Sequence, residues 1–181
     1  MARLTIDGFG QIELNNCAFR RDGRIEAQCA PDTTDFATAK VENGMLLAVD
    51  NVSRTVKSAT DSSLPIAITY SAEHMYDDRA NGLKDFALKG SDDFLPRLGY
   101  LAVGDKFTTN CISFGTEFAN ESAFISALGS LGTTALYGGA GADGAIAVSA
   151  SAPAFGPVLK AVKKTTMPDG TLGVKFQVFA D

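Results

Sequence analysis

The sequence has no tryptophan and only one histidine, His74, and both scarcities exclude kinds of site. Zinc sites and Ser or Cys triads usually need at least one histidine, often with further His or Cys partners. His74 stands beside Glu73, Asp77 and Asp78. This grouping could form a weak cation site on a helix, but a solvated helix face is the favoured interpretation. We therefore predict no catalytic residue, no metal site and no cofactor.

Acidic residues gather in the middle of the chain, and paired carboxylates are the groups that glycoside hydrolysis requires. The sequence lacks the tryptophan platforms that hold sugars, so a hydrolase that uses these acidic residues is only a remote alternative. The spaced D-x-D-x-D-G pattern of a calcium loop is also missing. The acidic residues concerned are Asp77, Asp78, Asp85, Asp92 and Asp93.

Long apolar runs and an excess of basic residues are missing too. No stretch approaches the roughly 18 apolar residues of a membrane helix, and the first residues, MARLTIDGFG, have no apolar core of a secretory signal. The net charge of −5 repels phosphate. We expect no membrane and no direct nucleic-acid partner, and synthesis in the cytoplasm.

The three cysteines are an odd number, so they cannot all pair within one chain. With no export signal, we expect buried, reduced thiols. Asp22-Gly23 predicts a hairpin whose loop length decides the register. A two-residue loop places Cys17 opposite Gln28, whereas a three-residue loop places it opposite Cys29. The sequence leaves pairing of Cys17 with Cys29 open.

Hydrophobic residues make up 45% of the chain, which is enough to build a core, and 18 glycines favour many turns and short strands. We predict a mainly β fold, a β-barrel or sandwich-like body built from hairpins, with one or two short helices. Residues 1–181 are expected to form a single β-rich domain. A soft internal boundary is expected near residues 114–120, where a Gly/Ala-rich C-terminal part begins.

The central expectation is a hairpin within residues 93–113. Residues 98–103 are almost continuously apolar, as in a strand covered on both faces. Residues 106–112 follow after Gly104-Asp105, where glycine suits a type II′ turn.

Several other turns and helices are predicted. Asn43-Gly44 fits a type I′ turn, and Met167-Pro168-Asp169-Gly170 separates strands at 158–166 and 171–179. A helix is expected to open at residues 120–122 and to close at Gly129. Residues 71–83 favour a second short helix, and residues 84–89 a strand.

Residues 137–144 read YGGAGADG. They lack the Gly-Lys-Ser/Thr ending of a phosphate-binding loop and the GxGxxG spacing. We predict a mobile surface loop, because glycine loses the most entropy when fixed. Together with the turn near residue 168 it is expected to contact neighbouring subunits rather than a small ligand. The residues predicted to make these contacts are Tyr137, Gly138, Gly139, Gly141, Asp143, Gly144, Pro168, Asp169 and Gly170.

Four segments together resemble a known class of protein. They read AKVENGMLLAVD, LPIAITYSAEHMYD, GLKDFALKG and LPRLGYLAVGDKFTTN, within residues 39–50 and 64–113. In this pattern of turns and strands the chain resembles capsid-decoration (cement) and related auxiliary proteins of tailed bacteriophages. The resemblance covers about half of the chain and carries no catalytic motif.

The resemblance implies a non-enzymatic virion protein on a small β-barrel-like body, bound to the major capsid protein in many copies or as a homo-oligomer. The acidic composition favours the outer capsid surface, because the inner surface meets packaged nucleic acid. A tail or neck protein of the virion is the alternative, since a tail-tube subunit is also β-rich.

Overall fold

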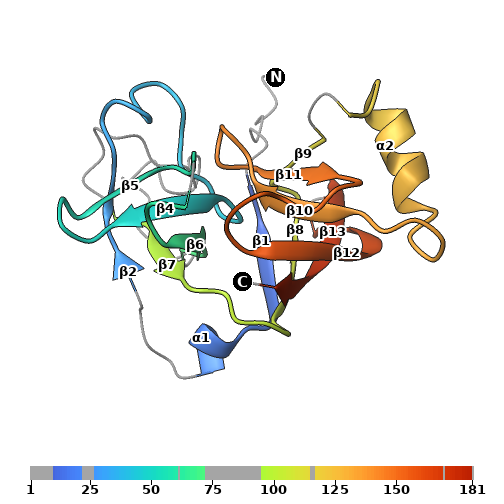
Figure 1. Ribbon diagram of the computed structural model, residues 1–181, viewed down its shortest axis with the longest axis horizontal. Coiled ribbons are helices and arrows are strands. Elements are labelled where there is room, and N and C mark those ends of the chain that lie inside the picture. Colours follow the sequence, from blue (N-terminus) through green and yellow to red (C-terminus); the bar gives the residue numbers. More distant parts are fainter. Residues whose placement is uncertain are drawn as a thin grey trace, which may run out of the picture.

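The computed structural model describes residues 10–21, 27–60, 62–71, 95–114, 117–168 and 170–180. The fold is mainly β, with two sheets and two short helices, as the sequence predicts (Figure 1). The strands of the six-stranded sheet gather in one half of the molecule and most of those of the seven-stranded sheet in the other.

Hydrogen bonding fixes the strand order of both sheets. The seven-stranded sheet has the order β1-β8-β13-β12-β10-β11-β9, and its strands are β1 (Ile12–Asn16), β8 (Lys106–Thr109), β9 (Ile112–Ser113), β10 (Tyr137–Ala140), β11 (Ile146–Ser149), β12 (Val158–Thr166) and β13 (Leu172–Ala180). The six-stranded sheet has the order β2-β7-β6-β4-β5-β3, and its strands are β2 (Ala27–Gln28), β3 (Ala30–Pro31), β4 (Leu46–Asp50), β5 (Thr55–Ser58), β6 (Ile66–Thr69) and β7 (Arg97–Gly99). The helices are α1 (Ala18–Arg21) and α2 (Glu121–Leu128).

The two sheets pack through β4, which is buried on both faces. Leu46 and Ile68 belong to the same apolar cluster as Leu159 and Phe176 of the seven-stranded sheet. Leu47, the next residue along β4, lies in a second cluster beneath the six-stranded sheet. Successive strand residues point to opposite faces. The continuous apolar run of β4 therefore reflects a strand covered on both sides.

The predicted central hairpin is wrong. β7 pairs with β2 and β6 in the six-stranded sheet, whereas β8 pairs with β1 and β13 in the seven-stranded one. The chain does turn between them, since the Asp105 amide donates to the Ala102 carbonyl at 2.9 Å. Gly104, with φ +95°, is the third residue of that turn, which fits type II rather than type II′. The connection thus crosses from one sheet to the other.

Buried carboxylate bonds hold that crossing in place. Asp105 is only 4% exposed. One of its carboxylate oxygens accepts from the Ala102 amide and the other from the Ala18 amide, both at 2.9 Å. The turn also joins β13, because the Gly104 amide donates to the Val178 carbonyl.

Of the other local predictions, one helix and one hairpin are confirmed, and one turn type is wrong. α2 lies where it was expected, with the Asn120 side chain accepting from the Ala123 amide and Gly129 at its C-terminus. The β12–β13 hairpin is also confirmed. The turn at Asn43-Gly44 exists, but only Gly44 has a positive φ, so it is not type I′. Positive φ at the third residue alone again fits type II.

All three cysteines are free and buried. Cys17 lies in the apolar cluster of the seven-stranded sheet, whereas Cys29 and Cys111 lie in the cluster of the six-stranded sheet. The three-residue register that would place Cys17 opposite Cys29 is thus not formed. The predicted turn at Asp22-Gly23, and most of the helix at 71–83 with the strand at 84–89, lie outside the described residues.

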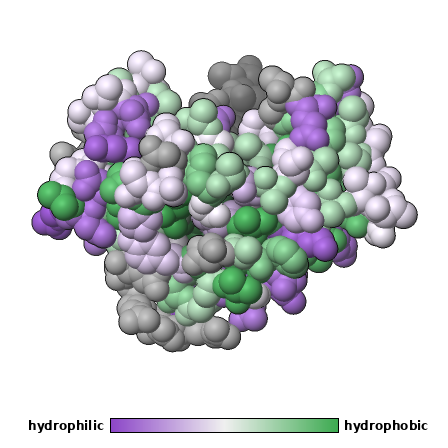
Figure 2. All heavy atoms as spheres, in the orientation of Figure 1, coloured by the Kyte–Doolittle hydropathy of each residue, from purple (hydrophilic) through white to green (hydrophobic). Residues whose placement is uncertain are grey.

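Strands from both sides of the predicted boundary at 114–120 pair in one sheet. β8 pairs with β13, and β9 pairs with β11. On the outside, hydrophilic residues gather toward the ends of the molecule and hydrophobic ones are more frequent along the middle (Figure 2).

Candidate functional site

The glycine-rich segment at 137–144 is not a mobile loop. Its first half is β10, an interior strand of the seven-stranded sheet. A Cβ atom on Gly138 would lie 2.7 Å from a methyl carbon of Ile146, and one on Gly139 would lie 2.5 Å from Pro153. The prediction of a mobile loop was wrong because it treated missing side chains as missing contacts. Here the glycines let neighbouring side chains pack directly on the backbone.

The second half of the segment is a turn seated against β4. The Gly144 amide donates to the Gly141 carbonyl at 3.0 Å, and the Gly144 carbonyl accepts from the Leu46 amide at 2.8 Å. Gly138, Gly139, Gly141 and Gly144 are buried, Tyr137 is half-buried and Asp143 is exposed. The segment therefore joins the two sheets, and Asp143 is its most accessible predicted contact residue.

The other predicted contact segment is the tip of the β12–β13 hairpin. Pro168 and Gly170 are exposed, and no described atom lies within 4 Å of a Cβ built on Gly170. Asp169 lies outside the described residues. Met167 is 3% exposed, and a Cβ on Gly173 would lie 2.7 Å from its sulfur. The tip is thus packed by its own methionine.

A cavity of about 490 Å³ is lined by residues that directly follow both segments, and no local sequence pattern predicts it. Ala145, directly after the glycine turn, and Thr171, directly after the hairpin tip, both line it. The full lining is Gly10, Glu42, Met45, Asn110, Cys111, Ile112, Phe114, Glu121, Phe124, Ala145, Thr171 and Leu172. These residues come from parts of the chain that only the tertiary fold brings together.

The chemistry of the cavity does not favour nucleophilic catalysis. Burial, with Glu42 and Asp143 nearby, raises the pKa of the Cys111 thiol to about 12. A thiol of this kind stays protonated at neutral pH, and the thiolate is the reactive form. Glu42 is already engaged, because its Oε2 accepts from the Gly10 amide at 2.6 Å. Glu121 lies in the first turn of α2, where a carboxylate favours the helix dipole.

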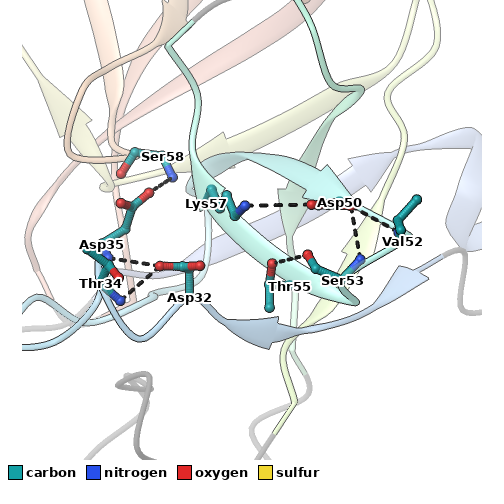
Figure 3. Close-up of polar contacts among 9 residues, drawn as sticks. All are labelled: Asp32, Thr34, Asp35, Asp50, Val52, Ser53, Thr55, Lys57 and Ser58. Carbon is teal, nitrogen blue, oxygen red and sulfur yellow. Dashed lines mark hydrogen bonds and ion pairs between the residues drawn. The ribbon is translucent and has the colours of Figure 1, made fainter.

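Three aspartates lie near β5 and look like a site, but they stabilise turns (Figure 3). Asp32 Oδ1 accepts from the Thr34 and Asp35 amides, and Asp35 Oδ2 accepts from the Ser58 amide at 2.9 Å. Asp50 Oδ1 accepts from the amides of residues 52 and 53, and its other oxygen lies 3.6 Å from Lys57 Nζ. The Asp32 and Asp50 carboxylates thus satisfy backbone N–H groups of their own turns, whereas the Asp35 carboxylate ties its turn to the last residue of β5.

The residues first considered for acid chemistry cannot be placed. His74 and the acidic residues between 77 and 93 lie outside the described residues. Within the part of the chain that the structure describes, no group of three or more His, Cys, Asp or Glu side chains is arranged to hold a metal ion. No described helix is long and apolar enough to cross a membrane.

Comparisons with known proteins add no relative. No family model, no curated protein and no solved structure matches this chain.

Proposed function

We propose that this chain is a non-enzymatic structural protein of a tailed-phage particle. It binds the outer surface of the capsid, with the major capsid protein as its partner, and stabilises the shell. The observation that carries the proposal is the β12–β13 hairpin, which combines an exposed tip with a rigid base.

The hairpin projects beyond its neighbours in the sheet. β10 pairs with β12 only at Leu159 and Lys160, and β8 pairs with β13 only from Val174 to Gln177. The last pairs before the tip, Thr165 with Gly173 and Thr166 with Leu172, have no third strand among the described residues. The result is a two-stranded arm, which Leu172, packed on the apolar cluster, and the 3.1 Å hydrogen bond from Asn110 Nδ2 to Thr171 Oγ1 hold against the body.

The arm is also ordered before any partner binds. The Met167 amide donates to the Thr171 carbonyl at 2.9 Å, and Met167 packs on Gly173. A preformed contact element loses little conformational entropy on binding. That property suits a protein that holds neighbouring subunits together.

Phage particles lacking this protein provide the test. Adding back the wild-type chain should raise their resistance to heat and to loss of internal pressure. The Pro168→Lys variant, changed at the exposed tip, should fold normally but restore less resistance. Val52→Lys is the matched control, because Val52 is 96% exposed in the β4–β5 turn, and it should restore full resistance.

Two results would contradict the proposal. One is equal heat resistance with and without the chain, together with its absence from the capsid surface. The other is sedimentation of the isolated chain as hexameric rings or open-ended polymers, which would favour the alternative of a tail or neck protein. Monomers, dimers or trimers agree with decoration.

A further inference from the structure

The outer surface of the seven-stranded sheet is rich in lysine. On β13, Val174, Phe176 and Val178 are buried in the core, so the alternate residues Lys175, Gln177 and Phe179 point away from it. Pairing extends this outward row to the neighbouring strands. Gln177 lies between Lys106 of β8 and Lys160 of β12, and Lys175 lies opposite Lys163. We call Lys106, Lys160, Lys163, Lys175 and Phe179 the lysine face.

These lysines repel one another, and no acidic side chain among the described residues is paired with them. Lys163 and Lys175 are directly opposite on adjacent strands, an arrangement that destabilises a sheet. None of the four lysines forms an ion pair with another described residue. Glu13 lies in the same row but opposite Thr108, and is therefore two strands away from Lys175. The face is a cationic area on a chain whose net charge is −5.

Exposed apolar groups lie beside the charges. Phe179 is 61% exposed, and Lys160 Nζ lies 5.7 Å from the centre of its ring. Val162, at the bulge in β12, is 47% exposed. Large apolar side chains within a polar rim are typical of contact surfaces.

Protection of a sheet edge does not explain the lysine face. Lysines on edge strands discourage pairing with other chains. β13 is an interior strand between β8 and β12, and β8 itself lies between β1 and β13. Lys175 and Lys106 therefore project from the middle of the sheet, where there is no edge to protect.

We infer that the lysine face docks an acidic protein surface, which is a surface of the capsid subunit; this identification of the partner rests on the proposed function. The remainder of this acidic chain repels such a surface, whereas the lysine face attracts it. Complementary charge of this kind fixes the orientation of docking and speeds association. Phe179 then supplies apolar contact at the end of this row, beside Lys160.

The test compares two double charge reversals that change the net charge equally. Lys160→Glu/Lys175→Glu alters the lysine face. Arg54→Glu/Arg97→Glu alters two exposed residues in the six-stranded half and is the control. Thermal unfolding confirms that both variants are folded. The copies of each chain bound to particles lacking the protein are counted between about 0.05 and 0.5 M salt, a range over which surface charges become screened.

The inference predicts that the lysine-face variant binds at least about tenfold more weakly than the control, which binds like wild type. Wild-type binding should also weaken as salt rises. Equal binding of the two variants, or binding that is independent of salt, overturns the inference while leaving the proposed function intact.

A second probe separates the two proposals. If the wild-type chain does not bind the particles, the proposed function fails. A labelled poly-L-glutamate peptide then tests whether the lysine face binds an acidic polypeptide. Binding of the peptide that is lost in Lys160→Glu/Lys175→Glu, but kept in the control, supports docking of an acidic polypeptide. No binding overturns it. Tighter binding of duplex DNA, or self-association that the lysine-face variant abolishes, also overturns it, because the occupant is then nucleic acid or a second copy.

Discussion

Gly144→Ala tests whether the glycine turn holds the two sheets together. Gly144 has φ +85°, and a Cβ there would lie 2.9 Å from Leu47 Cδ2 and 3.2 Å from the Met45 sulfur. A left-handed backbone costs an L-residue about 1–2 kcal/mol. Alanine also makes the unfolded chain less flexible, which offsets about 0.4–1 kcal/mol of this cost. Because Leu47 is fully buried and has little room to move, overpacking adds about 1–3 kcal/mol. We expect a total loss of about 2–4 kcal/mol.

Gly170→Ala and Gly104→Ala are the matched controls. Both glycines have positive φ, +88° and +95°, and neither has a described atom within 4 Å of its Cβ position. Each substitution should therefore cost only the backbone term, about 1 kcal/mol after the unfolded-state gain. Subtracting this value from the Gly144→Ala result isolates the contact with β4.

Urea unfolding, analysed by linear extrapolation, measures all three variants. The slopes should match that of the wild type, so that the shifts in midpoint report stability alone. A Gly144→Ala variant no less stable than Gly170→Ala would refute the reasoning. It would mean that the glycine turn is not seated on Leu47, and that the sheets are not joined there.

Two further predictions concern ionisable groups. Hydrogen bonds from Ser53, with the Val52 amide and Lys57, lower the pKa of Asp50 from 3.8 to about 2. The stabilising effect of the Asp50 carboxylate is therefore present above about pH 4 and is lost as pH falls toward 2. In acid-unfolding curves, the difference in stability between wild type and Asp50→Asn should shrink over that range, and a constant difference would contradict the assignment. Burial raises the pKa of the Cys17 and Cys111 thiols to about 12 and also raises that of Cys29. A thiol reagent at about pH 8 should therefore label the folded chain slowly, and should label all three cysteines quickly once denaturant is added. Fast labelling of the folded chain would show that a thiol is accessible.

Local features of the fold were predictable where neighbouring residues decide them. The Asn120 side chain and Gly129 delimit α2, and Pro168 with Gly170 marks the turn of the last hairpin. The alternation of Val174, Phe176 and Val178 with Lys175 and Gln177 matches the buried face of β13. Each of these patterns is complete within about ten residues.

The failures came from partners that are distant in sequence. Two apolar strands around Gly104-Asp105 look the same whether they pair with each other or join different sheets, and the choice depends on β2, β6, β1 and β13. Residues 137–144 looked mobile because nothing local shows that Ile146, Pro153 and Leu47 pack on their glycines. The cavity was missed for the same reason, since its lining spans residues from Gly10 to Leu172.

The position of β13 has a consequence for synthesis of the chain. It lies between β8 and β12 in the seven-stranded sheet, yet it is the last described strand to leave the ribosome. Until then β8 has an open edge, which is the kind of surface through which incomplete chains aggregate. Folding of this sheet is therefore completed only after β13 has been made. A nascent chain that stops before β13 lacks Lys175 and Phe179 of the lysine face, and its strands β8 and β12 have no strand between them.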